Sequence, residues 1–333
     1  MNWKYVKIAF LLLLALLVAI PAYRYFGSID WAKKHTKRIA ALPVLTDSDD
    51  TGEFRLPVGN FEFLVRVAGM QNKGKGVVLL HGFPESSIMW TPLLEKAATE
   101  GYRVIAFDQR GYSPEARPKG VDNYQIEHLT QDVIDVANQV GFDTFHLVGH
   151  DWGAVVSWNV AMEFPKRLHS LSTLSIPHIG VFFDAVQNHP EQKKRSGYFK
   201  MLQTPILPEY KFVANNQLFY KQMMGKNPKA YLDEYLALFA EAGAATATLN
   251  WYRAMDVEAF TTNNIFNKKI ETPTLFIWGK EDGVIVPAII PQQKTLIAAP
   301  YREIALQTGH GLIQSKPDTV IGEILAHFDL GEQ

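Results

Sequence analysis

The chain has 333 residues, of which 47% are hydrophobic, so it can bury a large core and does not have the composition of a disordered protein. Its formal net charge of -1, without a dense patch of basic and interleaved aromatic residues, argues against a nucleic-acid partner. The sequence contains no cysteine, which excludes disulfide bonds, thiolate metal sites and a cysteine nucleophile.

Residues 1–23 differ from the rest of the chain. Lys4 and Lys7 precede an unbroken apolar run over residues 8–20, which is short for a membrane span of about 20 residues. The run is compatible with a signal peptide and with an uncleaved membrane anchor, and a buried core helix is the third alternative. We expect this segment to give membrane association or export. The side of the membrane stays open, because basic residues lie on both sides of the run.

Residues 24–50 are expected to form a basic linker between this segment and a globular part. The basic residues that follow the apolar run are Arg24, Lys33, Lys34, Lys37 and Arg38. The pattern over residues 31–42 predicts a basic amphipathic helix, which is typical of a segment that lies on a membrane surface.

The globular part begins at Phe54. Residues 54–57 and 61–67 are predicted strands, and the alternation in the second strand predicts a half-exposed edge hairpin. Residues 76–80 are continuously apolar, as expected of a strand buried on both faces of a parallel sheet. The patterns that follow predict helices over residues 87–100, 126–140 and 154–164, and strands over 103–107, 145–148 and 168–176.

Residues 179–264 interrupt this alternation, because they are rich in Tyr, Phe and Met and mostly helical in pattern. We interpret them as an inserted helical cap. The alternation resumes with predicted strands over residues 274–278 and 303–306, a helix near 291–298, and a last helix that begins near Pro317. The sequence therefore predicts an α/β fold with a mostly parallel sheet, formed by residues 54–178 and 265–333.

The strand that ends near residue 148 passes directly into Gly149-His150-Asp151-Trp152-Gly153. Small residues on both sides of Asp151 allow a strained corner between strand and helix, which holds the central side chain out at the top of a sheet. A carboxylate at the nucleophile position of such a corner would form a covalent ester. The alternative is a glycine-rich turn with a solvated aspartate.

Two later polar loops also follow predicted strands. Asp282 lies in Trp278-Gly279-Lys280-Glu281-Asp282, and His310 lies in Gln307-Thr308-Gly309-His310. A histidine can deprotonate the water that cleaves an ester, and an acid can orient that histidine. The chain order of nucleophile, acid and histidine is that of the hydrolase triad. Glu281 competes with Asp282 for the role of the acid.

From Phe54 to the C-terminus the sequence resembles the α/β-hydrolase superfamily, and within it the epoxide hydrolases. His81-Gly82-Phe83-Pro84 resembles the oxyanion-hole loop of that family. The resemblance implies that the backbone N–H groups of Phe83 and Trp152 stabilise the oxyanion formed when the ester is hydrolysed. The loop from Asp108 to Ser113 is also typical of the group, and we interpret Arg110 as bracing loops.

Epoxide hydrolases supply two cap tyrosines that support the leaving oxygen. The segments Ser196-Gly197-Tyr198-Phe199 and Leu249-Asn250-Trp251-Tyr252-Arg253 resemble the two family motifs and nominate Tyr198 and Tyr252. A phenol with its ordinary pKa near 10 stays protonated at neutral pH and can donate to the ring oxygen. The resemblance thus implies the conversion of an apolar epoxide and water to a vicinal diol.

Two other functions remain open at this point. A haloalkane dehalogenase uses the same aspartate, acid and histidine; Trp152 could hold a halide, whereas the side chain of Phe83 cannot donate a hydrogen bond. A hydrolase-like binding protein would close its cap over a ligand without catalysis. No metal or organic cofactor is expected, because the histidines lack metal-ligand spacing and no glycine-rich phosphate loop is seen.

Overall fold

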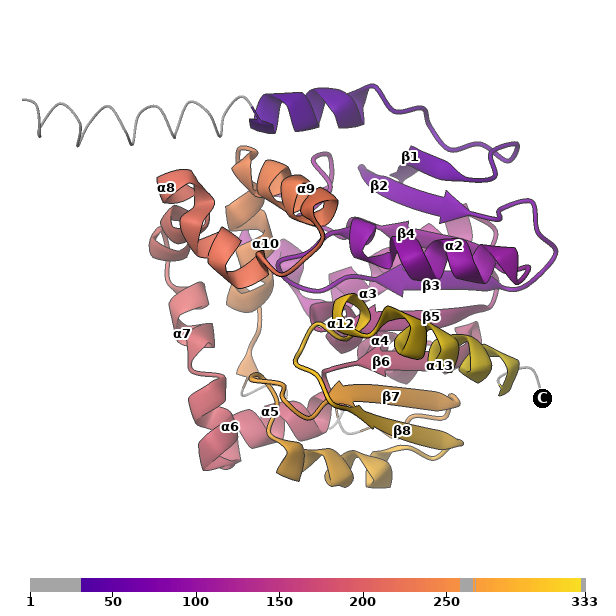
Figure 1. Cartoon of the computed structure of the whole chain (residues 1–333), viewed down its shortest axis with the longest axis vertical. Coiled ribbons are helices and arrows are strands. Elements are labelled where there is room, and N and C mark those ends of the chain that lie inside the picture. Colours follow the sequence, from indigo (N-terminus) through magenta and orange to yellow (C-terminus); the bar gives the residue numbers. More distant parts are fainter. Residues whose placement is uncertain (1–30, 258–265, 267, 331–333) are drawn as a thin grey trace, which may run out of the picture.

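The computed structural model describes residues 31–257, 266 and 268–330. An eight-stranded sheet with the order β1-β2-β4-β3-β5-β6-β7-β8 runs through its centre (Figure 1). The strands are β1 (Gly52–Val58), β2 (Phe61–Ala68), β3 (Gly76–Leu80), β4 (Arg103–Phe107), β5 (Phe145–His150), β6 (Leu168–Leu174), β7 (Thr274–Gly279) and β8 (Tyr301–Leu306). Strands β1 and β2 are antiparallel to their neighbours, and strands β3 to β8 are parallel to one another.

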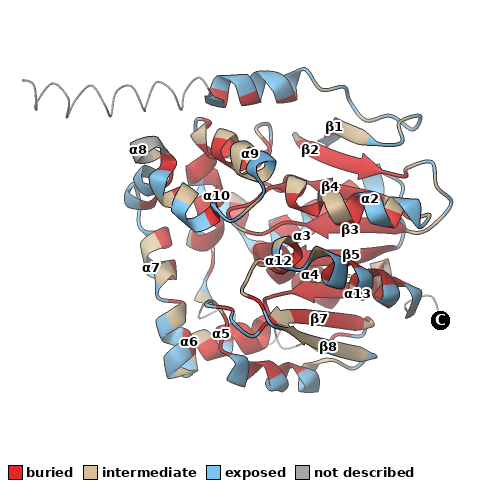
Figure 2. Ribbon diagram, in the orientation of Figure 1, coloured by how far each residue is buried: buried red, intermediate tan, exposed pale blue. Residues whose placement is uncertain are grey.

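Helices cover both faces of the sheet. Successive side chains of a strand point to opposite faces, so neighbouring residues of β3 belong to two different core clusters. Val77 and Leu79 of β3 belong to the core cluster that includes α2 (Thr91–Thr99) and α13 (Pro317–Leu330). The adjacent Val78 and Leu80 belong to the cluster that includes α3 (Ile126–Gln139) and α4 (Trp152–Glu163). All of β3 and β5 is buried (Figure 2), as expected of central parallel strands.

Among the described residues between β6 and β7, six helices gather to the left of the sheet in Figure 1. They are α5 (Ile179–Asn188), α6 (Pro190–Arg195), α7 (Tyr198–Gln203), α8 (Leu207–Met224), α9 (Lys229–Ala240) and α10 (Ala244–Arg253). The parallel sheet with flanking helices and this helical insertion is the predicted α/β-hydrolase architecture. We use the word cap for helices α5 to α10.

Three local predictions differ from the structure. Residues 63–68 of β2 are buried, not half-exposed, because β2 pairs with β4 and leaves β1 at the edge of the sheet. The helix predicted over residues 87–100 divides into a 3₁₀ turn, Ser87–Trp90, and α2. The helix predicted near residues 291–298 is a 3₁₀ segment, Pro287–Leu296, because Pro291 inside it has no N–H for an α-helical hydrogen bond.

The predicted membrane anchor or signal peptide, residues 1–23, lies outside the described residues. Residues 31–40 are helical and contact the folded domain, since His35 Nδ1 lies 2.9 Å from Glu241 Oε1 and Thr36 Oγ1 donates to the same oxygen at 2.7 Å. The following segment pairs with β1 through a bridge between Val44 and Arg55. None of the helices described in residues 31–330 has both the length and the apolar character that a membrane span requires.

Candidate active site

Asp151 occupies a strained corner at the carboxyl end of β5, between the strand and α4. Its backbone has φ 52° and ψ -119°, a conformation that L-residues rarely adopt. The two flanking glycines are required by close backbone approach: a Cβ on Gly153 would lie 2.1 Å from the Leu80 carbonyl oxygen, and one on Gly149 would lie 2.3 Å from the Gly153 carbonyl oxygen. The sequence therefore forces the carboxylate out at the top of the sheet.

The loops after β7 and β8 bring Asp282 and His310 to this carboxylate. His310 Nδ1 lies 2.7 Å from Asp282 Oδ2, and His310 Nε2 lies 3.3 Å from Asp151 Oδ2. Asp282 is itself fixed, because its Oδ1 accepts the Val284 backbone N–H at 2.7 Å. Glu281 instead accepts a hydrogen bond from Gln307, at 2.6 Å, on the exposed side of the loop. The geometry thus selects Asp282 as the acid beside His310.

The resting site holds opposite charges on Asp151 and His310. Burial alone would lower the pKa of His310, but Asp282 and Asp151 outweigh burial and raise that pKa well above its ordinary value. Burial likewise acts to raise the pKa of Asp151, but the hydrogen bond and charge of His310 hold it below its ordinary value. Both shifts favour an ionised Asp151 beside a protonated His310.

The loop after β3 supplies a hydrogen-bond donor to the other carboxylate oxygen. The Phe83 backbone N–H donates to Asp151 Oδ1 at 2.8 Å. Gly82 permits this approach, because a Cβ there would lie 2.5 Å from Asp151 Cβ. Trp152 is the first residue of α4, where a backbone N–H has no partner within its own helix. The Phe83 N–H thus contacts the carboxylate directly, and the Trp152 N–H is a helix-terminal donor directly after Asp151 in the chain.

Tyr198 and Tyr252 share a small cavity with Asp151 and Trp152. The cavity has a volume near 20 Å³, about the room that one water molecule needs. Its remaining walls are apolar and come from Val155, Ile176, Phe182, Phe183, Phe199 and Met255. The two tyrosine rings lie 6.3 Å apart between centroids, one from α7 and one from α10. Burial, followed by neighbouring acidic groups, raises the pKa of Tyr198, and burial raises that of Tyr252, so both phenols are protonated.

The other cap tyrosines lie elsewhere. The side chain of Tyr210 is 66% exposed, and the Tyr220 hydroxyl donates to the Pro84 carbonyl oxygen. Arg110 also lies away from the cavity and forms a bidentate pair with Asp132 at 2.7 and 2.6 Å. It therefore braces its loop against α3, as predicted. Within the described residues no group of three His, Asp or Glu side chains could hold a metal ion.

The sequence did not reveal how Glu85 and His150 support the site. His150 Nδ1 lies 3.0 Å from Glu85 Oε2, and His150 Nε2 lies 3.0 Å from the His310 carbonyl oxygen. His150 therefore links the Glu85 carboxylate to the backbone of the His310 loop. The same carbonyl accepts the Ser175 hydroxyl at 2.8 Å. His150 directly precedes Asp151 and Glu85 directly follows Pro84, but only the fold shows that they meet.

Replacing His150 by Gln should slow the step that needs His310, because the His310 loop loses the imidazole that contacts its backbone carbonyl. A displacement of a reacting group by about 1 Å can lower a rate roughly 100-fold, so we expect the catalytic rate to fall about 10- to 100-fold. Single-turnover kinetics would measure it. His128→Gln, on the exposed face of α3, is the matched control. An unchanged rate in His150→Gln would show that the contact to His310 has no positioning effect.

Comparison with known proteins agrees with this geometry. The family model described as alpha/beta hydrolase fold matches residues 76–317. Epoxide hydrolase 4 of Mus musculus is 32% identical over 262 residues, which cover 75% of this chain and 72% of the relative. An AB hydrolase superfamily protein of Bacillus subtilis is 35% identical over 270 residues, which cover 79% of this chain and 93% of the relative. The crystal structure of epoxide hydrolase A from Mycobacterium thermoresistibile superposes with a TM-score of 0.72 at 25% identity, over 83% of this chain and 98% of that chain.

The family-model match includes strands β3 to β8, the inserted helices and the loops that carry Asp151, Asp282 and His310. These comparisons confirm the resemblance that the sequence motifs indicated. The chain therefore belongs to the epoxide hydrolase family of the α/β-hydrolase superfamily.

Proposed function

We propose that this protein hydrolyses an apolar epoxide to a vicinal diol through a covalent ester on Asp151. One observation carries the proposal: the Asp151 carboxylate, held by the Phe83 N–H at 2.8 Å and by His310 at 3.3 Å, shares an apolar cavity with the buried phenols of Tyr198 and Tyr252. A nucleophile and two proton donors then meet across the space that an epoxide ring would occupy.

In the first half-reaction Asp151 attacks a ring carbon, and the bond between that carbon and the ring oxygen breaks. The oxygen becomes an alkoxide, which needs a hydrogen-bond or proton donor in an apolar cavity. Tyr198 and Tyr252 donate to it, and one phenol transfers its proton. The products of this step are a hydroxyalkyl ester on Asp151 and a tyrosinate.

Ester formation also changes His310. The ester carries no charge, so one of the two carboxylates that raise the pKa of His310 is lost. His310 can then return its proton to the tyrosinate and become a neutral base. In the second half-reaction it deprotonates a water that attacks the ester carbonyl, while the N–H groups of Phe83 and Trp152 stabilise the oxyanion. The intermediate then collapses: the bond between the Asp151 carbonyl carbon and the substrate oxygen breaks, and that oxygen takes the proton of the new carboxyl group. The diol leaves, and ionised Asp151 and protonated His310 are restored.

The cavity beside Asp151 has a volume near 20 Å³, about the room of one water molecule, so we expect cap side chains or helices to move when an epoxide enters. The apolar walls favour hydrophobic substrates. We further propose that residues 1–23 associate with a membrane or direct export, separately from the catalytic site.

Heavy-oxygen labelling tests the covalent route. With enzyme in excess and a single turnover in heavy-oxygen water, the label should enter the side chain of Asp151 and be absent from the diol. The reason is that water attacks the Asp151 carbonyl carbon, and the diol takes its second oxygen from the enzyme. Peptide mass spectrometry would detect the label. Labelled first-turnover diol with an unlabelled Asp151 peptide would mean that His310 directs water onto the epoxide itself.

A further inference from the structure

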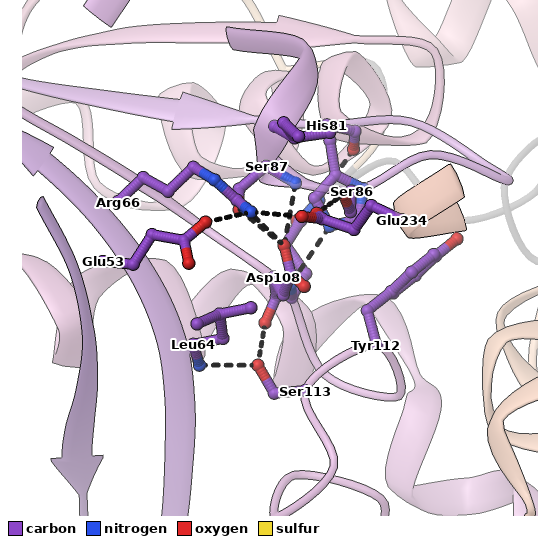
Figure 3. A network of polar contacts seen from close by, with 12 residues as sticks. Glu53, Leu64, Arg66, His81, Ser86, Ser87, Asp108, Tyr112, Ser113 and Glu234 are labelled. Carbon is purple, nitrogen blue, oxygen red and sulfur yellow. Dashed lines mark hydrogen bonds and ion pairs between the residues drawn. The ribbon is translucent and has the colours of Figure 1, made fainter. Parts of the chain in front are cut away.

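A buried polar cluster lies beneath the oxyanion loop and joins the cap to the core (Figure 3). We call it the Arg66 cluster; its members are Glu53, Arg66, Ser86, Ser87, Asp108 and Glu234. Ser86 and Ser87 lie three and four residues after Phe83, whose N–H contacts Asp151. The cluster therefore holds the end of the segment that supplies the oxyanion donor.

The cap reaches this segment through Glu234 of α9. Glu234 Oε1 accepts a hydrogen bond from the Ser86 hydroxyl at 2.5 Å, and Glu234 Oε2 accepts one from Arg66 Nη2 at 2.6 Å. From the core, Asp108 Oδ1 accepts the Ser87 backbone N–H at 2.8 Å and the Ser87 hydroxyl at 2.6 Å. Figure 3 shows Glu234 extending from the cap ribbon into these contacts.

The second cap helix contacts the same segment, because the Tyr220 hydroxyl of α8 donates to the Pro84 carbonyl oxygen. Helices α8 and α9 thus hold the oxyanion loop at residues 84 and 86, one and three residues after Phe83. The contact between Glu234 and Ser86 joins residues 148 positions apart in the chain. It forms only when α9 is packed on the core.

Ion pairs hold the Glu234 side chain in place beside Ser86. The side chains of Arg66 and Glu234 are only 7% and 9% exposed, so separating them would leave a desolvated charge without its partner. Asp108 and Glu53 also face Arg66, at 3.7 and 2.6 Å, and the half-exposed Arg38 lies 3.6 Å from Glu234. The position of Glu234, and with it that of Ser86, is therefore fixed by several ion pairs at once.

We propose that Glu234 is a positioning residue: when the cap is packed on the core, Glu234 fixes the position of the Phe83 N–H. This positioning mainly affects the rate of ester hydrolysis. This inference rests on the proposed covalent route. During ester formation the carboxylate oxygen bound by Phe83 loses charge, so a displaced donor does not slow that step. During hydrolysis the same oxygen gains charge as the tetrahedral intermediate forms, so a displaced donor raises the barrier.

Ser86→Ala and Glu234→Gln test the proposal, with Asp233→Asn as a control. Ser86→Ala deletes one hydroxyl and leaves every charge in place, whereas the Asp233 side chain is 44% exposed and pairs with Lys229 of the same helix. Rapid quenching and intact-mass spectrometry would give the rates of ester formation and hydrolysis. Removing an oxyanion donor costs about 100- to 1,000-fold, so we expect its displacement to slow hydrolysis roughly tenfold. Ester formation should keep its rate, and the steady-state fraction of esterified enzyme should rise.

The double variant adds a second check. If both side chains act through one contact, Ser86→Ala with Glu234→Gln should slow hydrolysis no more than the stronger single variant. Equal slowing of both half-reactions, or a lowered melting temperature with an unchanged ester fraction, would give Glu234 a structural role only and overturn the proposal. The absence of any ester in His310→Gln would instead contradict the covalent route itself.

Discussion

His310→Gln is expected to accumulate an ester on Asp151 and to release almost no diol. Asp151 attacks as a carboxylate and needs no base. The variant loses the part of the lowering of the Asp151 pKa that His310 causes, but the Phe83 N–H still stabilises the ionised carboxylate, so ester formation should continue. Hydrolysis needs a base to activate water, and loss of a general base costs about 100- to 10,000-fold. Intact-mass spectrometry after mixing with an epoxide should show an added mass equal to that of the substrate.

Asp151→Asn is the matched control, because it keeps the size of the side chain but cannot form the ester by this route. It should show no added mass with the same epoxide. If His310→Gln binds substrate and also gains no mass, the covalent mechanism is wrong. If His310→Gln releases diol at the normal rate, the base lies elsewhere, although His310 is the side chain that contacts both Asp151 and Asp282 at 3.3 and 2.7 Å.

The nucleophile corner could be predicted because its causes are local. Gly149 and Gly153 stand where a Cβ would collide with backbone atoms, and that requirement is visible in five consecutive residues. Asp282 and His310 followed from topology, because loops at the carboxyl ends of parallel strands meet at one edge of a sheet. Short-range sterics and strand order were sufficient to bring these side chains together in the prediction.

Contacts that depend on packing could not be predicted in this way. The alternation in β2 indicated a half-exposed strand, but the burial of β2 depends on its pairing with β4, which follows only after β3 and α2 in the chain. The same holds for Glu85 and His150, which are 65 positions apart. Each residue looks like an ordinary polar side chain until the fold places it beside the other.

The basic helix at residues 31–40 shows a related limit. Its sequence predicts an amphipathic helix but does not specify what covers each face. The structure places His35 and Thr36 against Glu241 at the C-terminal end of α9, a contact between residues more than 200 positions apart. One face of this helix therefore packs on protein. The expectation of a membrane contact now concerns its exposed face, which includes Trp31, 42% exposed.

Tyr198→Phe and Tyr252→Phe are expected to slow ring opening, each by roughly one to three orders of magnitude, because each removes a donor to the alkoxide. The double variant should be nearly inactive in forming the ester. Phenylalanine keeps the ring contacts, such as those of Tyr252 with Phe83 at 5.0 Å and Trp152 at 5.1 Å between centroids, so the change isolates the hydroxyl. Rapid-quench measurement of ester formation would give the rates.

Tyr210→Phe provides the control, because Tyr210 is a cap tyrosine whose side chain is 66% exposed and should not affect ring opening. The result for the double variant also separates the two aspartate chemistries. An epoxide oxygen stays attached to the substrate and needs a proton, whereas a halide leaves as a stable anion and needs no phenol. Near-normal ester formation in the double variant would therefore remove both tyrosines from the reaction. Release of halide from a haloalkane by that variant would then favour the dehalogenase alternative, in which Trp152 donates a hydrogen bond to the halide.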